Sequence, residues 1–226
     1  MKTTTYRPIP LGLTMLIALF GALVALALSG GHDASAHDDA THASSAIPEK
    51  ELALRQDMRK LWEDHVTWTR LAVISLTTDS ADTHATVGRL LRNQTDIGNA
   101  IKPFYGKKAG NQLTALLREH IVIASDLIAV ARKGDDEAVS AEQARWRANA
   151  DTIAAFLSSA NPAWKPAATK AMMRRHLRLT TDEVVARLTK DWAADVRAYD
   201  RIHTQILHMA DMLSDGLVAQ FPARFR

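Results

Sequence analysis

Three histidines recur along the chain at nearly equal spacing. His65, His120 and His176 are separated by 55 and 56 residues. Each follows two large apolar and two charged residues and precedes an aliphatic residue, which indicates a tandem repeat. Because the apolar residues lie three and four positions earlier, each imidazole should share the apolar face of its helix. The spacing therefore predicts three histidines that point into a helical core.

A second set of polar residues repeats in the segments that follow the first two histidines. Asn93 and Asp96 correspond to Asn149 and Asp151. Polar groups inside a bundle must be hydrogen-bonded or hold a ligand, so we expect these four residues and the histidines to form a polar layer. The third copy of the repeat is weaker, since its partner segment, residues 208–211, requires a shift of register.

Two kinds of function are compatible with such a layer. Imidazole and carboxylate groups from facing helices suit a transition metal ion such as Zn or Cu. His65 and His120 would then be completed by His176, His203 or Asp200. The same layer could hold a small ligand. In the alternative interpretation the protein is a structural or protein-interaction module, and the neutral imidazoles only set helix register through hydrogen bonds.

Motifs of common enzyme classes are missing from the sequence. There is no Gly-rich phosphate loop, no Gly-x-Ser-x-Gly and no His-Glu-x-x-His. A dinuclear ferritin-like centre needs two Glu-x-x-His motifs, and Asp200-x-x-His203 is a single approximate relative. The chain has no cysteine, so a metal would be held by His, Asp, Glu or Asn. We therefore favour a non-catalytic binding protein over an enzyme.

The elements that must position these residues are helices. Apolar residues recur at helical spacing, and no window alternates with the period of a strand. The pattern predicts an all-α antiparallel helical bundle, with four long helices plus short extras, built from a duplicated helical hairpin. The expected helices are 49–76, 83–102, 111–133, 140–161, 166–177 and 180–216.

The first 36 residues have the composition of a targeting segment. Lys2 and Arg7 precede an apolar run over residues 11–28, and Ala34-Ser35-Ala36 forms a small-x-small cleavage pattern. The segment predicts export to the periplasm or another extracytoplasmic space. In the alternative, the run is retained as an anchor in the inner membrane, since it is just long enough to span a bilayer; this is the only membrane contact that we expect.

The remaining chain divides into a short linker and one domain. Residues 37–49 are rich in His and Asp and predict a flexible linker, in which His37 and His42 could capture Zn or Cu loosely. Residues 50–226 form the bundle domain. The chain has 28 Lys and Arg and 25 Asp and Glu; without Lys2, Arg7 and Asp33 the balance is 26 to 24. Such a balance argues against a nucleic-acid partner.

Several short motifs in the predicted bundle resemble an uncharacterised family of bacterial all-helical proteins. They are Trp-x-x-His-x-x-Trp-Thr-Arg at 62–70, Arg-Leu-Leu-x-Asn at 89–93, Pro-Phe-Tyr-Gly at 103–106, Asn-Ala-Asp at 149–151, Met-Ala-Asp at 209–211 and Gln-Phe-Pro at 220–222. The resemblance covers residues 61–222. It implies a shared helical fold and no established activity.

Overall fold

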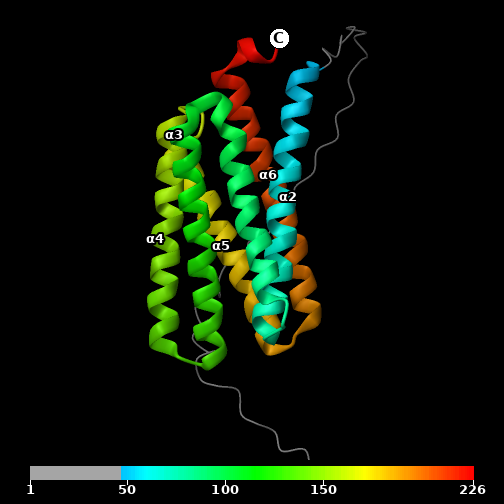
Figure 1. The fold of residues 1–226 in the computed structure, drawn as a ribbon, viewed down its shortest axis with the longest axis vertical. Coiled ribbons are helices and arrows are strands. Elements are labelled where there is room, and N and C mark those ends of the chain that lie inside the picture. The colour runs from blue at the N-terminus through cyan, green and yellow to red at the C-terminus, as the bar shows by residue number, and fades with distance from the viewer. Residues whose placement is uncertain (1–46) are drawn as a thin grey trace, which may run out of the picture.

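A computed structural model describes residues 47–226, and in these residues the chain is helical with no strand. The all-α prediction is confirmed, as is the antiparallel bundle (Figure 1). The helices are α2 Glu49–Thr78, α3 Thr83–Lys133, α4 Asp136–Ala160, α5 Pro166–Thr189 and α6 Trp192–Gln220, followed by a 3-10 turn, η1 Pro222–Arg224.

The long helix α3 is two helical segments joined at a sharp bend. Gly106 has φ 82° and ψ 170°, which is not helical, and Pro103 precedes it within the helix. The bundle therefore consists of three antiparallel hairpins. Hairpin 1 is α2 with residues 83–105, hairpin 2 is residues 107–133 with α4, and hairpin 3 is α5 with α6 (Figure 1).

The turns inside the hairpins repeat with the same spacing as the histidines. Asp79, Gly134 and Lys190 end the first helix of each hairpin in the left-handed conformation, with φ of 58°, 74° and 62°. They too are 55 and 56 residues apart. Since the backbone geometry recurs as well as the sequence, the tandem repeat extends to the third hairpin.

Hairpin 3 corrects the predicted helix boundaries. Helices were expected at 166–177 and 180–216, yet α5 continues through Thr180 to Thr189. The Thr180 hydroxyl donates to the carbonyl of His176 at 3.0 Å instead of capping a new helix. The cap of α6 is Asp191, whose carboxylate accepts from the Ala194 amide. The expectation of four long helices plus short extras is thus replaced by six helical segments of similar length.

The start of α4 also differs from its prediction. A helix was expected from residue 140, but α4 begins at Asp136. The carboxylate of Asp135 accepts a hydrogen bond from the Ala138 amide at 3.0 Å and caps the helix. An aspartate directly after the left-handed Gly134 provides both the turn and the cap, so the helix starts one turn earlier.

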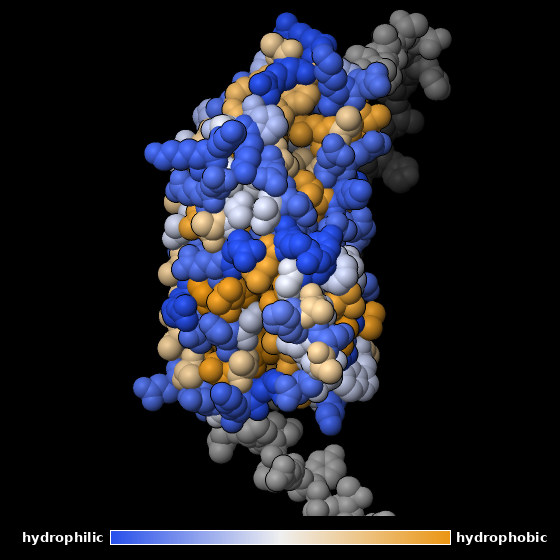
Figure 2. Space-filling view, in the orientation of Figure 1, coloured by the Kyte–Doolittle hydropathy of each residue, from blue (hydrophilic) through white to orange (hydrophobic). Residues whose placement is uncertain are grey.

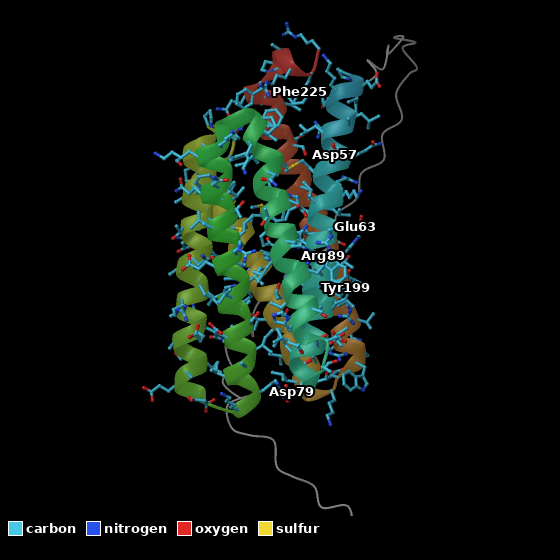
Figure 3. All side chains as sticks on the ribbon, in the orientation of Figure 1. Asp57, Glu63, Asp79, Arg89, Tyr199 and Phe225 are labelled. Carbon is cyan, nitrogen blue, oxygen red and sulfur yellow. The ribbon has the colours of Figure 1, made fainter. Side chains whose placement is uncertain are left out.

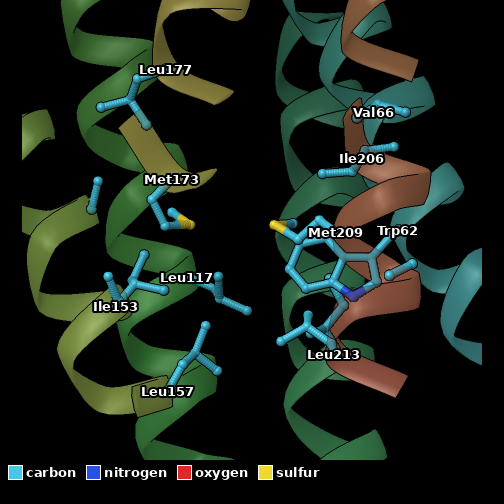
Figure 4. Close-up of a cluster of buried hydrophobic side chains, with 14 of the residues drawn as sticks. Trp62, Val66, Leu117, Ile153, Leu157, Met173, Leu177, Ile206, Met209 and Leu213 are labelled. Atoms are coloured by element: carbon cyan, nitrogen blue, oxygen red, sulfur yellow. The ribbon is translucent and has the colours of Figure 1, made fainter. Parts of the chain in front are cut away.

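One hydrophobic core runs through all three hairpins. Its buried side chains come from every helix, and several of them face each other across the centre of the bundle (Figure 4). Hairpins 1 and 3 are also joined at the surface. Arg59 donates through Nε and Nη2 to the two carboxylate oxygens of Asp211, and Arg55 binds Asp215. Burial of one apolar stripe from each helix against the same centre holds the bundle together.

The visible face of the bundle is mostly hydrophilic, with apolar side chains in small separate groups (Figure 2). Between residues 47 and 226, none of the helices has a stretch long and apolar enough to cross a bilayer. The predicted leader, the anchor at residues 11–28 and the linker up to residue 46 lie outside the described residues.

Candidate functional site

The three repeated histidines meet inside the bundle. His65, His120 and His176 are only 3%, 4% and 4% exposed, and all three line one internal cavity. The ring centroids of His65 and His176 are 5.7 Å apart. His120 lies close enough for its charge state to influence that of His65. The first helix of each hairpin contributes one imidazole to this cluster, which we call the histidine layer.

Each histidine of the layer is held by a side-chain amide from the second helix of its own hairpin. His120 Nδ1 is 2.8 Å from Asn149 Oδ1, and His176 Nδ1 is 3.1 Å from Gln205 Oε1. His65 Nδ1 is 3.2 Å from Gln94 Nε2. In every hairpin the two partners are 29 residues apart, so the same contact is built three times.

These contacts determine which ring nitrogen carries the proton. An amide oxygen only accepts, so Nδ1 of His120 and of His176 donates and Nε2 keeps its lone pair. His65 differs because an amide nitrogen faces its Nδ1, which favours the tautomer with the proton on Nε2. Gln94 Nε2 is held in this direction because it also donates to the carbonyl of Leu90 at 2.9 Å and to Asn93 Oδ1 at 3.1 Å, while its Oε1 is buried without a partner among residues 47–226.

In hairpins 1 and 2 an asparagine of the second helix also bonds to the backbone of the first helix. Asn93 Nδ2 donates to the carbonyl of Leu61 at 2.9 Å, and Asn149 Nδ2 donates to that of Leu116 at 3.2 Å. Both carbonyls lie four residues before the layer histidine. Asn149 is thereby fixed beside His120, and Asn93 accepts from Gln94 Nε2, the group that contacts His65.

Burial keeps the layer uncharged. It holds the pKa of His65 well below the usual value, and the neighbouring His176 and His120 lower that pKa further, while a hydrogen bond to Asn93 acts in the opposite direction. Burial, with help from His176, lowers the pKa of His120 to about 3. Burial also lowers the pKa of His176. All three imidazoles are therefore neutral at physiological pH, which is the form that can donate a lone pair.

The cavity beside the layer is small and mostly apolar. Its volume is about 30 Å³, enough for one or two water-sized groups. Trp62 and Trp164 form part of its wall, together with Met58, Met173 and Met209. Leu213 also lines the cavity, and Figure 4 shows it below Trp62. Any molecule or ion in this cavity would contact mainly apolar side chains and the rings of His65, His120 and His176.

None of the three Nε2 atoms of the layer has a hydrogen-bond partner in the described part of the chain. His120 Nε2 is fully buried and accepts nothing, although its lone pair is free. The imidazole ring of His120 packs against the indole ring of Trp146, with ring centroids 5.2 Å apart. Buried polar atoms without a partner are uncommon in folded proteins and often mark the place of a bound water or ion.

Other residues predicted for the site lie on the surface. His203 Nε2 is 3.0 Å from Glu63 Oε1, on the outer side of α2, where Figure 3 shows Glu63. Asp200 and Asp96 are exposed. Asp151 pairs with Arg174 and Lys170 rather than with a histidine.

The outward direction of Asp96 and Asp151 follows from helix geometry. Each lies two residues after the amide that contacts a histidine, Gln94 or Asn149. Two residues correspond to about 200° around an α-helix, so each carboxylate points away from the layer. In residues 47–226, no group of three or more His, Asp or Glu side chains lies close enough together to hold a metal ion as the side chains stand.

The sequence interpretation missed two of the three amides. Gln94 and Gln205 were not predicted, because only asparagines were sought as partners and the third copy was aligned on residues 208–211. A constant separation of 29 residues from each histidine to an amide side chain would have identified both.

The chain was compared with protein families, with curated proteins and with solved structures. No family model matches the chain, and neither a curated protein nor a solved structure was found to match it.

Proposed function

We propose that the protein is a non-catalytic binding protein that holds one transition metal ion in the histidine layer, through Nε2 of His65, His120 and His176. The observation that carries the proposal is the buried, unpartnered Nε2 of His120 in a cluster with two further neutral imidazoles. Imidazole nitrogen is a common ligand for Zn and Cu.

The hydrogen bonds at Nδ1 support this assignment. In metal sites the non-ligating nitrogen of a histidine usually donates to an oxygen, which fixes the ring and raises the basicity of the ligating nitrogen. Asn149 and Gln205 provide this oxygen for His120 and His176. At His65, binding through Nε2 would require the Gln94 carboxamide to turn and to give up the donation of its Nε2 to the Leu90 carbonyl and to Asn93 Oδ1.

The spacing of the rings is compatible with contraction around an ion. Two imidazoles bound to one ion through Nε2 have ring centroids about 5 Å apart, because a metal–nitrogen bond is about 2.0–2.1 Å long. His65 and His176 are 5.7 Å apart. For this pair, binding would require the ring centroids to approach by less than about 1 Å.

A second candidate is a purely structural layer. Its support is that each imidazole–amide contact joins the two helices of one hairpin, always at a separation of 29 residues. Such contacts would set the register of each hairpin without any ligand. The two candidates differ in whether the Nε2 atoms have a partner.

Metal titration of the purified full-length chain separates these candidates. We expect about one Zn(II) or Cu(I) per chain, measured by elemental analysis after gel filtration. The double variant His65→Gln/His120→Gln should lose this binding at least tenfold, while His203→Gln, on the surface, should keep it. A variant lacking residues 37–46 tests whether the linker histidines contribute.

The outcomes are distinct. Stoichiometric binding that survives in the double variant, with helicity unchanged by circular dichroism, would contradict the proposal. Binding that disappears with residues 37–46 would move the site to the linker. If no metal binds and the double variant only loses stability, the structural candidate is correct.

A further inference from the structure

Three methionines line the same cavity as the three histidines. Met58, Met173 and Met209 are 4%, 4% and 3% exposed and come from α2, α5 and α6. Figure 4 shows the sulfur atoms of Met173 and Met209 pointing toward each other across the centre of the bundle. Three thioether side chains therefore lie around the same cavity as the three imidazoles.

The repeat does not require methionine at these positions. Met173 lies three residues before His176, where hairpins 1 and 2 have Trp62 and Leu117. Met209 lies four residues after the layer amide Gln205, and the corresponding residue after Asn149 is Ile153. All of these side chains are buried in the same core. The apolar core is thus satisfied by other side chains at the corresponding positions, and at these two positions only hairpin 3 has sulfur.

The charge of the cavity restricts which ion it can hold. The described side chains that line it include no Asp, Glu, Lys or Arg. Without a carboxylate nearby, a divalent ion would keep its full charge in an apolar interior, which is costly. A monovalent ion has a smaller desolvation cost.

From the donors and the charge together, we infer that the ion is Cu(I) and that the thioethers of Met173 and Met209 join the imidazoles as its ligands. Soft sulfur donors select Cu(I) over Zn(II), whereas imidazole alone suits both. This inference rests on the proposed function, since it identifies the metal of the same site. It goes further in assigning two ligands from hairpin 3.

A pair of double variants tests the role of the sulfur atoms. In Met173→Leu/Met209→Leu the volume and the apolar character of both side chains are nearly kept, so the bundle should still fold. The matched control is Met172→Leu/Met212→Leu, since both residues are partly buried against the core and neither lines the cavity.

Affinity is measured on the full chain without oxygen, by competition with a chromophoric Cu(I) chelator. We expect the cavity variant to lose at least tenfold in Cu(I) affinity, with Zn(II) affinity unchanged and with the control like the parent chain. X-ray absorption of the Cu(I)-loaded parent chain should show sulfur as well as nitrogen in the coordination shell, and the cavity variant should show nitrogen alone.

The results separate failure of this inference from failure of the proposed function. If the chain prefers Zn(II), or if Cu(I) binds with the same affinity in the cavity variant and with nitrogen ligands only, the assignment of Cu(I) and sulfur is overturned while the histidine site remains. If neither metal binds to the parent chain, the proposed function itself is wrong.

Discussion

Seven residues after each layer histidine the three hairpins carry different side chains: Ala72, Leu127 and Glu183. Glu183 is 1% exposed and accepts a hydrogen bond from Arg70 at 2.7 Å. Arg70 also binds both carboxylate oxygens of Asp195, which Arg187 contacts as well. At the position where hairpins 1 and 2 have an apolar side chain, hairpin 3 therefore has a buried charged network. It consists of Arg70, Glu183, Arg187 and Asp195 and connects α2, α5 and α6.

At the residue scale this network predicts an unusual dependence of stability on pH. Burial raises the pKa of Glu183 to about 7; the nearby Asp195 raises it further, while Arg70 and Arg187 oppose the shift. Because the folded pKa lies above the unfolded value, the stabilisation is fully present below about pH 4.5 and is lost as the pH rises through about 7.

Urea denaturation at pH 5 and at pH 8 measures this effect. Relative to Glu183→Gln, the parent chain should lose on the order of 1–3 kcal/mol of unfolding free energy between these pH values. The control Glu137→Gln changes an exposed carboxyl on α4 and should follow the parent chain. Equal pH dependence in the parent chain and in Glu183→Gln would mean that Glu183 does not titrate in this range.

At the element scale the clearest difference between hairpins is the residue that ends the first helix. Hairpin 2 uses Gly134, which adopts positive φ without steric cost, whereas hairpin 3 uses Lys190 with φ 62°. The backbone amide of Lys190 bonds the carbonyl of Arg187 in the same way that Gly134 bonds that of Ala131. The two turns are thus equivalent in geometry and differ in strain.

Exchange of these residues should change stability in opposite directions. Lys190→Gly should stabilise the bundle by about 0.5–1 kcal/mol, because relief of the left-handed strain exceeds the added entropy of the unfolded chain. Gly134→Lys should destabilise it by about 1 kcal/mol. Thermal denaturation of both variants tests this; a lower melting temperature for Lys190→Gly would show that the Lys190 side chain contributes more than its backbone costs.

At the scale of the whole molecule, hairpins 1 and 2 approach closely where α3 folds back at Gly106. A Cβ atom built on Gly98 would lie 2.6 Å from the carbonyl oxygen of Gly110, and one on Gly110 would lie 2.6 Å from that of Gly98. The two glycines therefore allow two backbones to touch. Their contact sets the distance between hairpins 1 and 2 near the bend at Gly106.

Gly98→Ala should destabilise the molecule by roughly 2–3 kcal/mol, because a backbone carbonyl cannot move aside as a flexible side chain can. Gly88 on the same helix has open space around it, so Gly88→Ala should stabilise the chain slightly through helix propensity. Denaturant titrations compare the two. If Gly98→Ala is as stable as the parent chain, the hairpins can separate without cost, and the close packing is not essential.

Much of this architecture could be predicted from the sequence, because it depends on local periodicity. Helical spacing of apolar residues identified the helices, and the recurrence of a histidine after two large apolar residues placed three imidazoles in the core. A predicted helix boundary was wrong where the same residue types can serve different purposes. A helix was expected to begin at Thr180, but the Thr180 hydroxyl donates to the carbonyl of His176 within α5, and Glu183 forms a buried ion pair with Arg70.

Taken by itself, the sequence determined the helical class, the repeat and the burial of His65, His120 and His176, because each depends on residues within a few turns of one helix. Only the tertiary structure decided which side chains meet. It paired His176 with Gln205, turned Asp96 and Asp151 outward and placed Met173 opposite Met209. Such contacts depend on the rotation and packing of whole helices, which local periodicity does not specify.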